Sequence, residues 1–208
     1  VDKGPPLDGA ERAAVVRQCC KALVYMERFG VLHRDFRGCN IFLKGRGVGC
    51  RVQVIDLGFM ITADPQHERN PNPAVRCAWQ GDPERKVRFD WAPPEVRASR
   101  APNFGLPAYS FDVYSFGVLV LKLLQGRSFA QDALHGEDLW QKLRAISKEV
   151  EEVGMSVDLL ANILDRSVPA QRPLASQILY HLNQTRRSAG AGTSGVASSV
   201  AGVLPQRR

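Results

Sequence analysis

The sequence lacks a long hydrophobic run and a signal peptide. Nowhere do roughly 18 or more apolar residues follow one another, the length that indicates a transmembrane helix. The most hydrophobic stretch, residues 113–124, is too short to cross a bilayer and contains Lys122. We therefore expect a soluble segment that makes no membrane contact.

Cysteine is present without the spacing of a disulfide framework or a zinc site. The five cysteines are an odd number, and no two of them form a C-x-x-C pair. They are Cys19, Cys20, Cys39, Cys50 and Cys77. We expect reduced thiols in a cytosolic or nuclear compartment, and we predict a cytoplasmic location.

The sequence also lacks a basic helix face and aromatic residues interleaved with basic ones, although its formal net charge is +7. The basic residues are scattered, and part of the excess lies near the carboxyl terminus at Arg186, Arg187, Arg207 and Arg208. This distribution does not favour a nucleic-acid partner. A site for nucleotide phosphates and acidic peptide substrates would use the charge equally well.

What is present is a globular, mainly helical pattern of one domain, with 44% hydrophobic residues and no internal repeat. Apolar residues at three- and four-residue steps predict a helix over 10–29, which Gly30 would end as a carboxyl-terminal cap. Further helices are expected over residues 111–126, 137–153, 156–164 and 174–183. Two strands are expected at 41–44 and 51–55, and the turn over 45–50 lacks the P-loop pattern.

The chemistry is concentrated in VLHRDFRGCN, at residues 31–40, and in VIDLG, at residues 54–58. Apolar runs lead to two carboxylates, Asp35 and Asp56, and to the amide of Asn40 at strand ends. Phosphoryl transfer from a nucleotide needs a carboxylate base and oxygen ligands for magnesium. This pattern predicts Asp35 as the base, with Asn40 and Asp56 on the metal.

These residues resemble eukaryotic protein kinases, in which the catalytic loop reads H-R-D-x-x-x-x-N and the metal-binding motif reads D-F-G, here with Leu57 in place of Phe. The resemblance implies an α+β, mainly α fold: a kinase C-terminal lobe whose short β-hairpin carries the catalytic and metal-binding loops. It implies ATP and Mg²⁺ as cofactors and a protein substrate. It also implies that Arg37 contacts a phosphate and that Phe42 forms the floor of the adenine pocket.

Further positions take their expected roles from the same resemblance. His33 and Arg34 of the motif are structural or regulatory residues. Residues 56–95 correspond to the activation segment, which ends in a variant of A-P-E with Pro93 in place of Ala and contains Thr62 but no Ser or Tyr. Arg172 would pair with Glu95 of that motif. Asp112, which opens a D-x-x-S-x-G pattern, would accept hydrogen bonds from the catalytic-loop backbone.

One hypothesis concerns an acidic residue in place of a regulatory phosphate. Glu84 lies eleven residues before Glu95, where many kinases carry a phosphate that pairs with the Arg of the H-R-D motif, and Asp82 is nearby. Either carboxylate could pair permanently with Arg34. The alternative is ordinary surface charge, because an exposed pair contributes only ~0–1 kcal/mol.

The resemblance covers only the large lobe of the kinase family. The chain begins with Val1 and not Met, and nothing before residue 10 supplies the Gly-rich loop or the strand lysine of the small lobe. We therefore expect a fragment of a longer kinase that is inactive alone. Its parts would be a linker over residues 1–9, the lobe over 10–186 and a disordered tail over 187–208.

The function expected is transfer of the ATP γ-phosphate to a protein hydroxyl, with Ser/Thr favoured over Tyr. One alternative is a pseudokinase that acts as an interaction or scaffolding module, because Arg37, Arg88 and Pro93 depart from the common kinase pattern. Small-molecule phosphotransferases similar to aminoglycoside kinases share the carboxylates and the amide. Those enzymes usually lack counterparts of Arg34 and Arg172.

Overall fold

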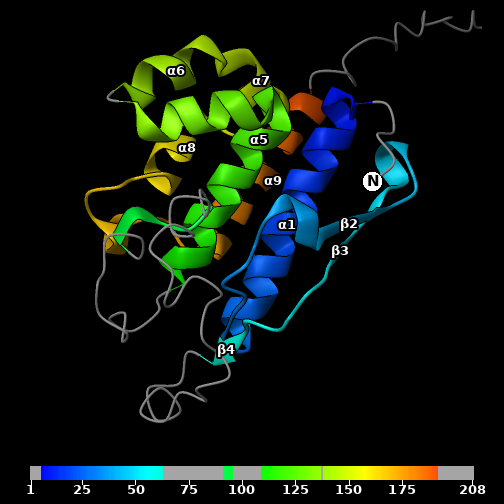
Figure 1. Ribbon diagram of the computed structural model, residues 1–208. Helices are drawn as coiled ribbons and strands as arrows, with labels where there is room; N and C mark the ends of the chain where they lie inside the picture. The colour runs from blue at the N-terminus through cyan, green and yellow to red at the C-terminus, as the bar shows by residue number, and fades with distance from the viewer. Residues whose placement is uncertain (1–5, 63–90, 96–108, 137, 192–208) are drawn as a thin grey trace, which may run out of the picture.

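A body of helices carries two short pairs of antiparallel strands on one side (Figure 1). The structure, a computed structural model, describes residues 6–62, 91–95, 109–136 and 138–191. Its helices are α1 (Gly9–Arg28), α5 (Ser110–His135), α6 (Leu139–Ala145), α7 (Ser147–Glu152), α8 (Val157–Ile163) and α9 (Ala175–Ala191). Its strands are β1 (Val31–Leu32), β2 (Ile41–Lys44), β3 (Arg51–Val54) and β4 (Ile61–Thr62). The mainly helical fold with a short hairpin is the one predicted.

Helix α1 begins and ends as its sequence dictates. The Asp8 side chain accepts a hydrogen bond from the backbone of Glu11, whose own carboxylate accepts from the Asp8 backbone, which is a reciprocal capping box. After the helix, Gly30 has a φ of +65°, a conformation that glycine adopts without steric penalty. One face is buried through Val15, Val16, Cys19, Cys20 and Leu23.

Helix α5 is the buried centre of the lobe, and its first stretch ends at Gly126, as predicted. Nearly every side chain of its first half is buried. At Gly126, where the prediction ended the helix, φ is +83°, and a second helical stretch then continues to His135. Arg12 donates from Nη1 to the carbonyl of Leu124 just before this break, at 3.4 Å. The second stretch persists because Ala130, Ala133 and Leu134 are buried.

The single helix predicted over residues 137–153 is wrong, because the structure has two helices, α6 and α7. They meet at Ile146, whose φ of −112° and ψ of 23° are not helical. Leu143, Ile146 and Val150 are all buried across this break, so the three- and four-residue spacing continues through it. Hydrophobic periodicity alone therefore could not locate the break. In contrast, α8 begins where predicted, with the Ser156 hydroxyl as its amino-terminal cap.

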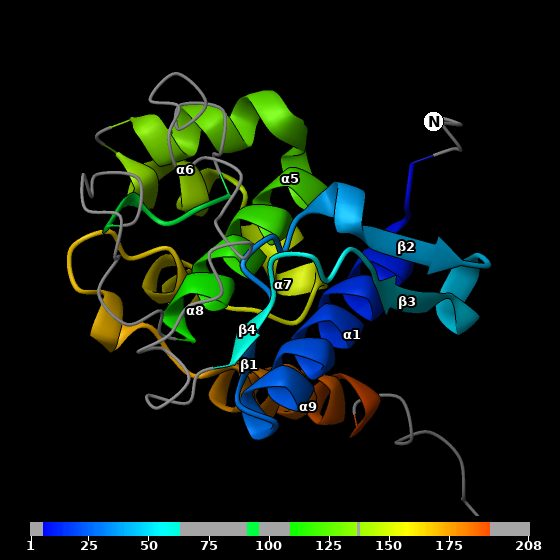
Figure 2. The ribbon, with the colours of Figure 1, turned by 60° about the horizontal axis from the view of Figure 1, so that its bottom comes forward.

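Helix α9 packs alongside α1 and also exceeds its predicted length (Figure 2). Arg17 on α1 donates to the carbonyl of Leu182 at 2.6 Å, and the Glu27 carboxylate accepts from the backbone of Ala175 at 2.8 Å. The helix continues past the predicted end at residue 183 to Ala191, and so enters the tail expected from residue 187. Residues 192–208 lie outside the described residues.

The β2–β3 hairpin is tied to α1 along its length. Phe42 is paired with Gln53 in the antiparallel register. Gln18 on α1 donates to the carbonyl of Cys50 at 2.9 Å and accepts from the backbone of Val52 at 3.0 Å. The connection predicted as a plain turn contains a short 3-10 helix, Gly47–Gly49, which is anchored by α1 rather than free.

The tip of this hairpin is held by a buried carboxylate. Glu11, which is 3% exposed, accepts from the backbone of Gly47 at 2.6 Å and pairs with Arg46 at 3.0 Å. Arg46 also donates to the carbonyl of Pro6 at 3.2 Å.

Within the ranges that the structure describes, none of the helices combines the length and apolar character needed to cross a membrane.

Close packing between α5 and α8 predicts a sensitive glycine. A Cβ atom added at Gly117 would lie 2.6 Å from a side-chain carbon of Ile163 and 2.8 Å from one of Leu164. Both neighbours are fully buried, so we expect Gly117→Ala to lower the free energy of unfolding by about 1–3 kcal/mol. Denaturant unfolding measures this change.

The control is Gly49→Ala, because no atom lies within 4 Å of a Cβ built at that position. We expect its free energy of unfolding to stay within about 0.5 kcal/mol of the wild type. Equal midpoints for the two variants would contradict the packing described for α5 and α8.

Candidate functional site

The loop after β1 is fixed by one buried carboxylate. Asp112, in the first turn of α5 and 4% exposed, accepts from the backbone of His33 at 2.6 Å and of Arg34 at 2.8 Å. Burial raises the pKa of Asp112, and the two N–H donors counteract that rise. Arg34 has a φ of +65°, which is uncommon for a residue with a side chain. The two hydrogen bonds thus hold the loop at its strained position.

His33 joins this loop to the strand end that leads to Asp56. Its ring is fully buried, with Nδ1 3.3 Å from the backbone nitrogen of Asp35 and Nε2 3.3 Å from the carbonyl of Ile55. A neutral ring that accepts at Nδ1 and donates from Nε2 satisfies both contacts. Phe36 packs edge-on against the ring at 5.8 Å between centroids.

Asp35 is a buried carboxylate with a partner on each oxygen. Asn40 donates from Nδ2 to Oδ2 at 2.7 Å, and Nε of Arg37 lies 2.9 Å from Oδ1. Burial raises the pKa of Asp35, whereas the Arg37 charge and the Asn40 amide act in the opposite direction. A carboxylate oriented in this way can accept a proton from a hydroxyl placed against it.

Asn40 and Asp56 supply oxygens suited to a hard cation. The Asn40 Nδ2 also donates to the carbonyl of Asp35 at 2.9 Å, and its Oδ1, which accepts from the Cys39 thiol at 3.6 Å, keeps a second lone pair for a metal. The backbone of Ile55 donates to the carbonyl of Asn40 at 2.9 Å, which brings the strand end before Asp56 to Asn40. Asp56 is exposed. An amide and a carboxylate oxygen fit the oxygen preference of Mg²⁺, which keeps several waters.

No larger metal cluster accompanies these two groups in the part of the chain that the structure describes. Among those residues, no group of three or more His, Cys, Asp or Glu side chains could hold an ion. A Mg²⁺ site of one carboxylate and one amide does not require such a group.

Apolar side chains are exposed beside this loop. Phe42 on β2 is 52% exposed and Leu57 is 54% exposed, and Ile55 is also exposed. Phe42 and Ile55 share one face of the hairpin, because Phe42 pairs with Gln53, two residues before Ile55. Exposed apolar residues on one face can form a surface for a ligand or a partner. Phe42 therefore lies on the open face of the hairpin, where an apolar ring could pack.

Trp91, near the end of the segment that precedes α5, contacts the loop that follows β1. The guanidinium carbon of Arg37 lies 4.3 Å from the centre of the Trp91 ring. Ser115, on α5, donates from its hydroxyl to the carbonyl of Trp91 at 2.8 Å. The Asp35–Arg37 pair thus contacts a residue near the end of the predicted activation segment.

Arg172 is a second buried charged residue, and it binds the end of the segment that contains Trp91. Arg172 has a fully buried side chain and contacts both oxygens of Glu95, at 2.6 Å from Nη1 and 2.9 Å from Nη2. It also donates to the carbonyls of Asp165 and Ser110, and its guanidinium carbon lies 4.8 Å from the Tyr114 ring centre. Bidentate geometry of this kind is the strong form of an Arg–carboxylate pair.

Some of the predicted site falls outside the described residues. Glu84, Asp82 and Arg88 lie there, so the proposed pairing of Glu84 or Asp82 with Arg34 stays a hypothesis. Pro93 is described and is buried.

Sequence reasoning missed the residues that hold the hairpin, Glu11 and Gln18. The D-x-x-E spacing of Asp8 and Glu11 signals a capping box, which would have placed Glu11 at the start of α1. No local pattern signals its contact with Gly47 or that of Gln18 with Val52, because each joins elements far apart in the sequence.

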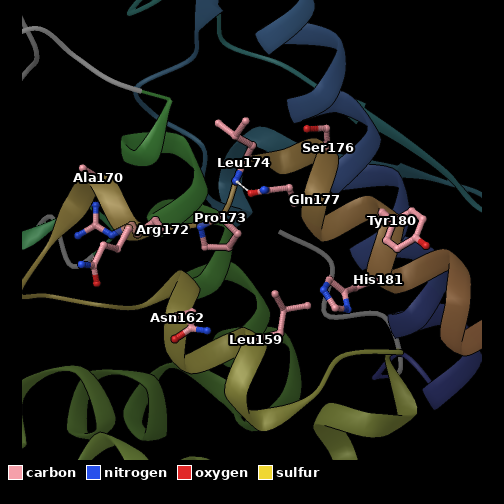
Figure 3. Close-up of a pocket in the computed structure, with 11 residues that line it drawn as sticks. Leu159, Asn162, Ala170, Arg172, Pro173, Leu174, Ser176, Gln177, Tyr180 and His181 are labelled. Atoms are coloured by element: carbon pink, nitrogen blue, oxygen red, sulfur yellow. Dashed lines mark hydrogen bonds between the residues drawn. The ribbon is translucent and has the colours of Figure 1, made fainter.

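A groove of about 770 Å³ lies away from this site, between α8 and α9 (Figure 3). Leu159 and Asn162 come from α8, and Tyr180 and His181 come from α9. Arg172 is the one predicted site residue that also lines the groove. The catalytic-loop residues therefore form a site separate from this groove.

Comparison with known proteins identifies a common family. The family described as the protein kinase domain matches residues 2–190. The serine/threonine-protein kinase PAK mbt of Drosophila melanogaster is 29% identical over 182 residues, which are 84% of this chain and 25% of that protein. The LRR receptor-like serine/threonine-protein kinase GHR1 of Arabidopsis thaliana is 31% identical over 149 residues, which are 68% of this chain and 12% of that protein.

A solved structure shares the fold. ROP2 from Toxoplasma gondii, described as a virulence factor with a protein-kinase fold and no enzymatic activity, superposes with a TM-score of 0.58. It is 20% identical, and the match covers 87% of this chain and 44% of that one. The chain thus spans less than half of each of these relatives.

The buried Arg172 pair predicts a large loss of stability when one partner is removed. We expect Arg172→Ala to lower the free energy of unfolding by about 3–5 kcal/mol, because the hydrogen bonds to Glu95, Asp165 and Ser110 lose their common donor. Thermal unfolding monitored by circular dichroism measures this loss.

The control is Arg51→Ala, since Arg51 is exposed on β3. Its melting temperature should equal that of the wild type. If Arg172→Ala melts at the same temperature as Arg51→Ala, the Arg172–Glu95 pair does not hold the segment to the lobe.

Proposed function

This chain belongs to the protein kinase family and forms its C-terminal lobe, and from that premise we propose that its parent protein transfers the ATP γ-phosphate to a Ser or Thr hydroxyl of a protein substrate. The observation that carries the proposal is the Asp35 carboxylate, which is buried, held by Asn40 at 2.7 Å and set 2.9 Å from Arg37. A binding module has no need for a carboxylate held in this way.

Asp35 is the proposed base. Its carboxylate orients the attacking hydroxyl of the substrate and accepts its proton as the new oxygen–phosphorus bond forms, while the bond between the γ-phosphorus and the bridging oxygen breaks and ADP leaves. Asp112 fixes the loop through the His33 and Arg34 backbone, so the carboxylate needs no rearrangement before it acts.

Asn40 and Asp56 are the proposed magnesium ligands. The Asn40 Oδ1 and the exposed Asp56 carboxylate would hold Mg²⁺, which neutralises the phosphate charge when it is bound. Phe42 offers its exposed ring to the adenine of ATP, and Arg37 offers its guanidinium to the phosphate.

The rest of the ATP site belongs to the proposed longer parent. The chain covers 25% of the Drosophila relative and 12% of the Arabidopsis relative, so the parent's activity is part of the proposal. We propose that a small lobe completes the site in a cytoplasmic protein, and that the 208 residues alone do not transfer phosphate. The names of those relatives, both serine/threonine kinases, support Ser/Thr over Tyr.

A kinase-fold binding module without catalysis is the second candidate. Arg88 and Pro93 favour it, because they lie in the segment that presents the substrate in kinases and depart from the common pattern there. The two candidates differ in one measurable property, which is metal-dependent phosphate transfer.

Substitution of the proposed base tests the function. In the natural full-length protein, we expect Asp35→Asn to lower kcat by at least about 100-fold, because the amide cannot accept the proton, while ATP still binds. Transfer of radiolabelled phosphate to a mixed protein substrate measures kcat, and calorimetry measures nucleotide binding.

Asp158→Asn, at an exposed position on α8, is the matched control and should retain full activity. Intact mass of the native protein shows first whether a small lobe is present, because this chain alone has a mass of 23.0 kDa. A wild-type protein that contains a small lobe but transfers no phosphate would favour the binding module, and full turnover by Asp35→Asn would exclude Asp35 as the base.

A further inference from the structure

Arg37 lies between an acid and an aromatic face. Its Nε is 2.9 Å from Oδ1 of Asp35, and its guanidinium carbon is 4.3 Å from the centre of the Trp91 ring. The Arg37 side chain is 37% exposed, whereas that of Asp35 is 3% exposed. The guanidinium therefore has one side against protein and another side open to a ligand.

Trp91 is the fixed member of this contact. The residue is 5% exposed, and its carbonyl accepts a hydrogen bond from the Ser115 hydroxyl at 2.8 Å. Further along the same segment, Glu95 is held through both oxygens by Arg172. The indole is therefore anchored to α5 through its own backbone and to the connection before α9 through Glu95.

A fixed aromatic face limits the freedom of a partly exposed arginine. Guanidinium groups are attracted to the face of Trp, and their planar shape lets them stack while their N–H groups point outward. Because the Arg37 side chain is 37% exposed, the exposed part of its guanidinium can meet two oxygens of a phosphate. Without the ring, this long side chain would sample other rotamers.

We propose that Trp91 is a positioning residue for phosphoryl transfer, whose indole holds the Arg37 guanidinium where it contacts both Asp35 and the transferred phosphate. This inference rests on the proposed function. It links the end of the activation segment to the base through one side chain, so displacement of that segment also displaces Arg37.

Kinetics of the natural full-length protein test the proposal. Trp91→Leu keeps an apolar side chain but removes the aromatic face, and we expect kcat to fall about tenfold while KM for ATP changes less than about twofold. Trp91→Phe keeps a ring and should recover most of the loss. Trp140→Leu, which removes an exposed tryptophan on α6, is the control and should leave kcat unchanged.

A double variant shows whether Trp91 acts through Arg37. If it does, Trp91→Leu combined with Arg37→Met should be no slower than Arg37→Met alone. Losses that multiply, a Trp91→Phe variant as slow as Trp91→Leu, or a fully active Trp91→Leu would each overturn the proposal. The variants are compared at a temperature below their measured melting points.

Fluorescence tests the contact without reference to activity. Within these 208 residues, Trp79→Phe and Trp140→Phe leave Trp91 as the one tryptophan. In the natural protein that carries both substitutions, we expect Arg37→Met to change the tryptophan emission while the control Arg51→Met does not. Equal emission in all three proteins would show that the contact is absent and would overturn the inference. If the wild type transfers no phosphate, the proposed function and the role of Trp91 fail together, and this response still reports whether the side chains touch.

Discussion

The buried carboxylate of Asp112 is the constraint on which the rest of the site depends. Its two oxygens accept from consecutive backbone N–H groups of His33 and Arg34, at 2.6 and 2.8 Å, and all three residues are buried. A carboxylate in such a place is costly unless hydrogen bonds surround it, and the N–H groups it receives would be equally costly without an acceptor. Helix and loop therefore stabilise each other, and the strained φ of Arg34 persists because this pairing holds it.

From that point the site is built by contacts between elements that are distant in the sequence. His33 joins the loop to the strand end before Asp56, and Asn40 joins the loop to the hairpin. The hairpin in turn is held to α1 by Glu11 and Gln18. Helix α5, the β2–β3 hairpin and helix α1 thus support the loop that carries Asp35 and Asn40 and the strand end before Asp56. Proposed catalytic groups need rigid supports of this kind.

The sequence predicted the elements better than the contacts between them. The H-R-D-x-x-x-x-N spacing placed Asp35 and Asn40 on one loop, because a motif of fixed length folds locally. The break at Ile146 was missed because the hydrophobic period continues through it. The first stretch of α5 ends at Gly126 as predicted, but the second stretch to His135, which buries Ala133 and Leu134, was not predicted. The hairpin clamp by Glu11 and Gln18 depends on tertiary packing and has no counterpart in local sequence.

Amide hydrogen exchange at His33 and Arg34 tests the central claim most directly. Asp112→Asn keeps the shape of the side chain but leaves one oxygen for two donors, so we expect at least one of these amides to exchange about 10-fold faster or more, as loss of a hydrogen bond to a charged acceptor implies. The amide of Val52, held by Gln18, should keep its wild-type rate. Unchanged exchange at both His33 and Arg34 would contradict the account, because it would show that the loop keeps its geometry without the Asp112 carboxylate.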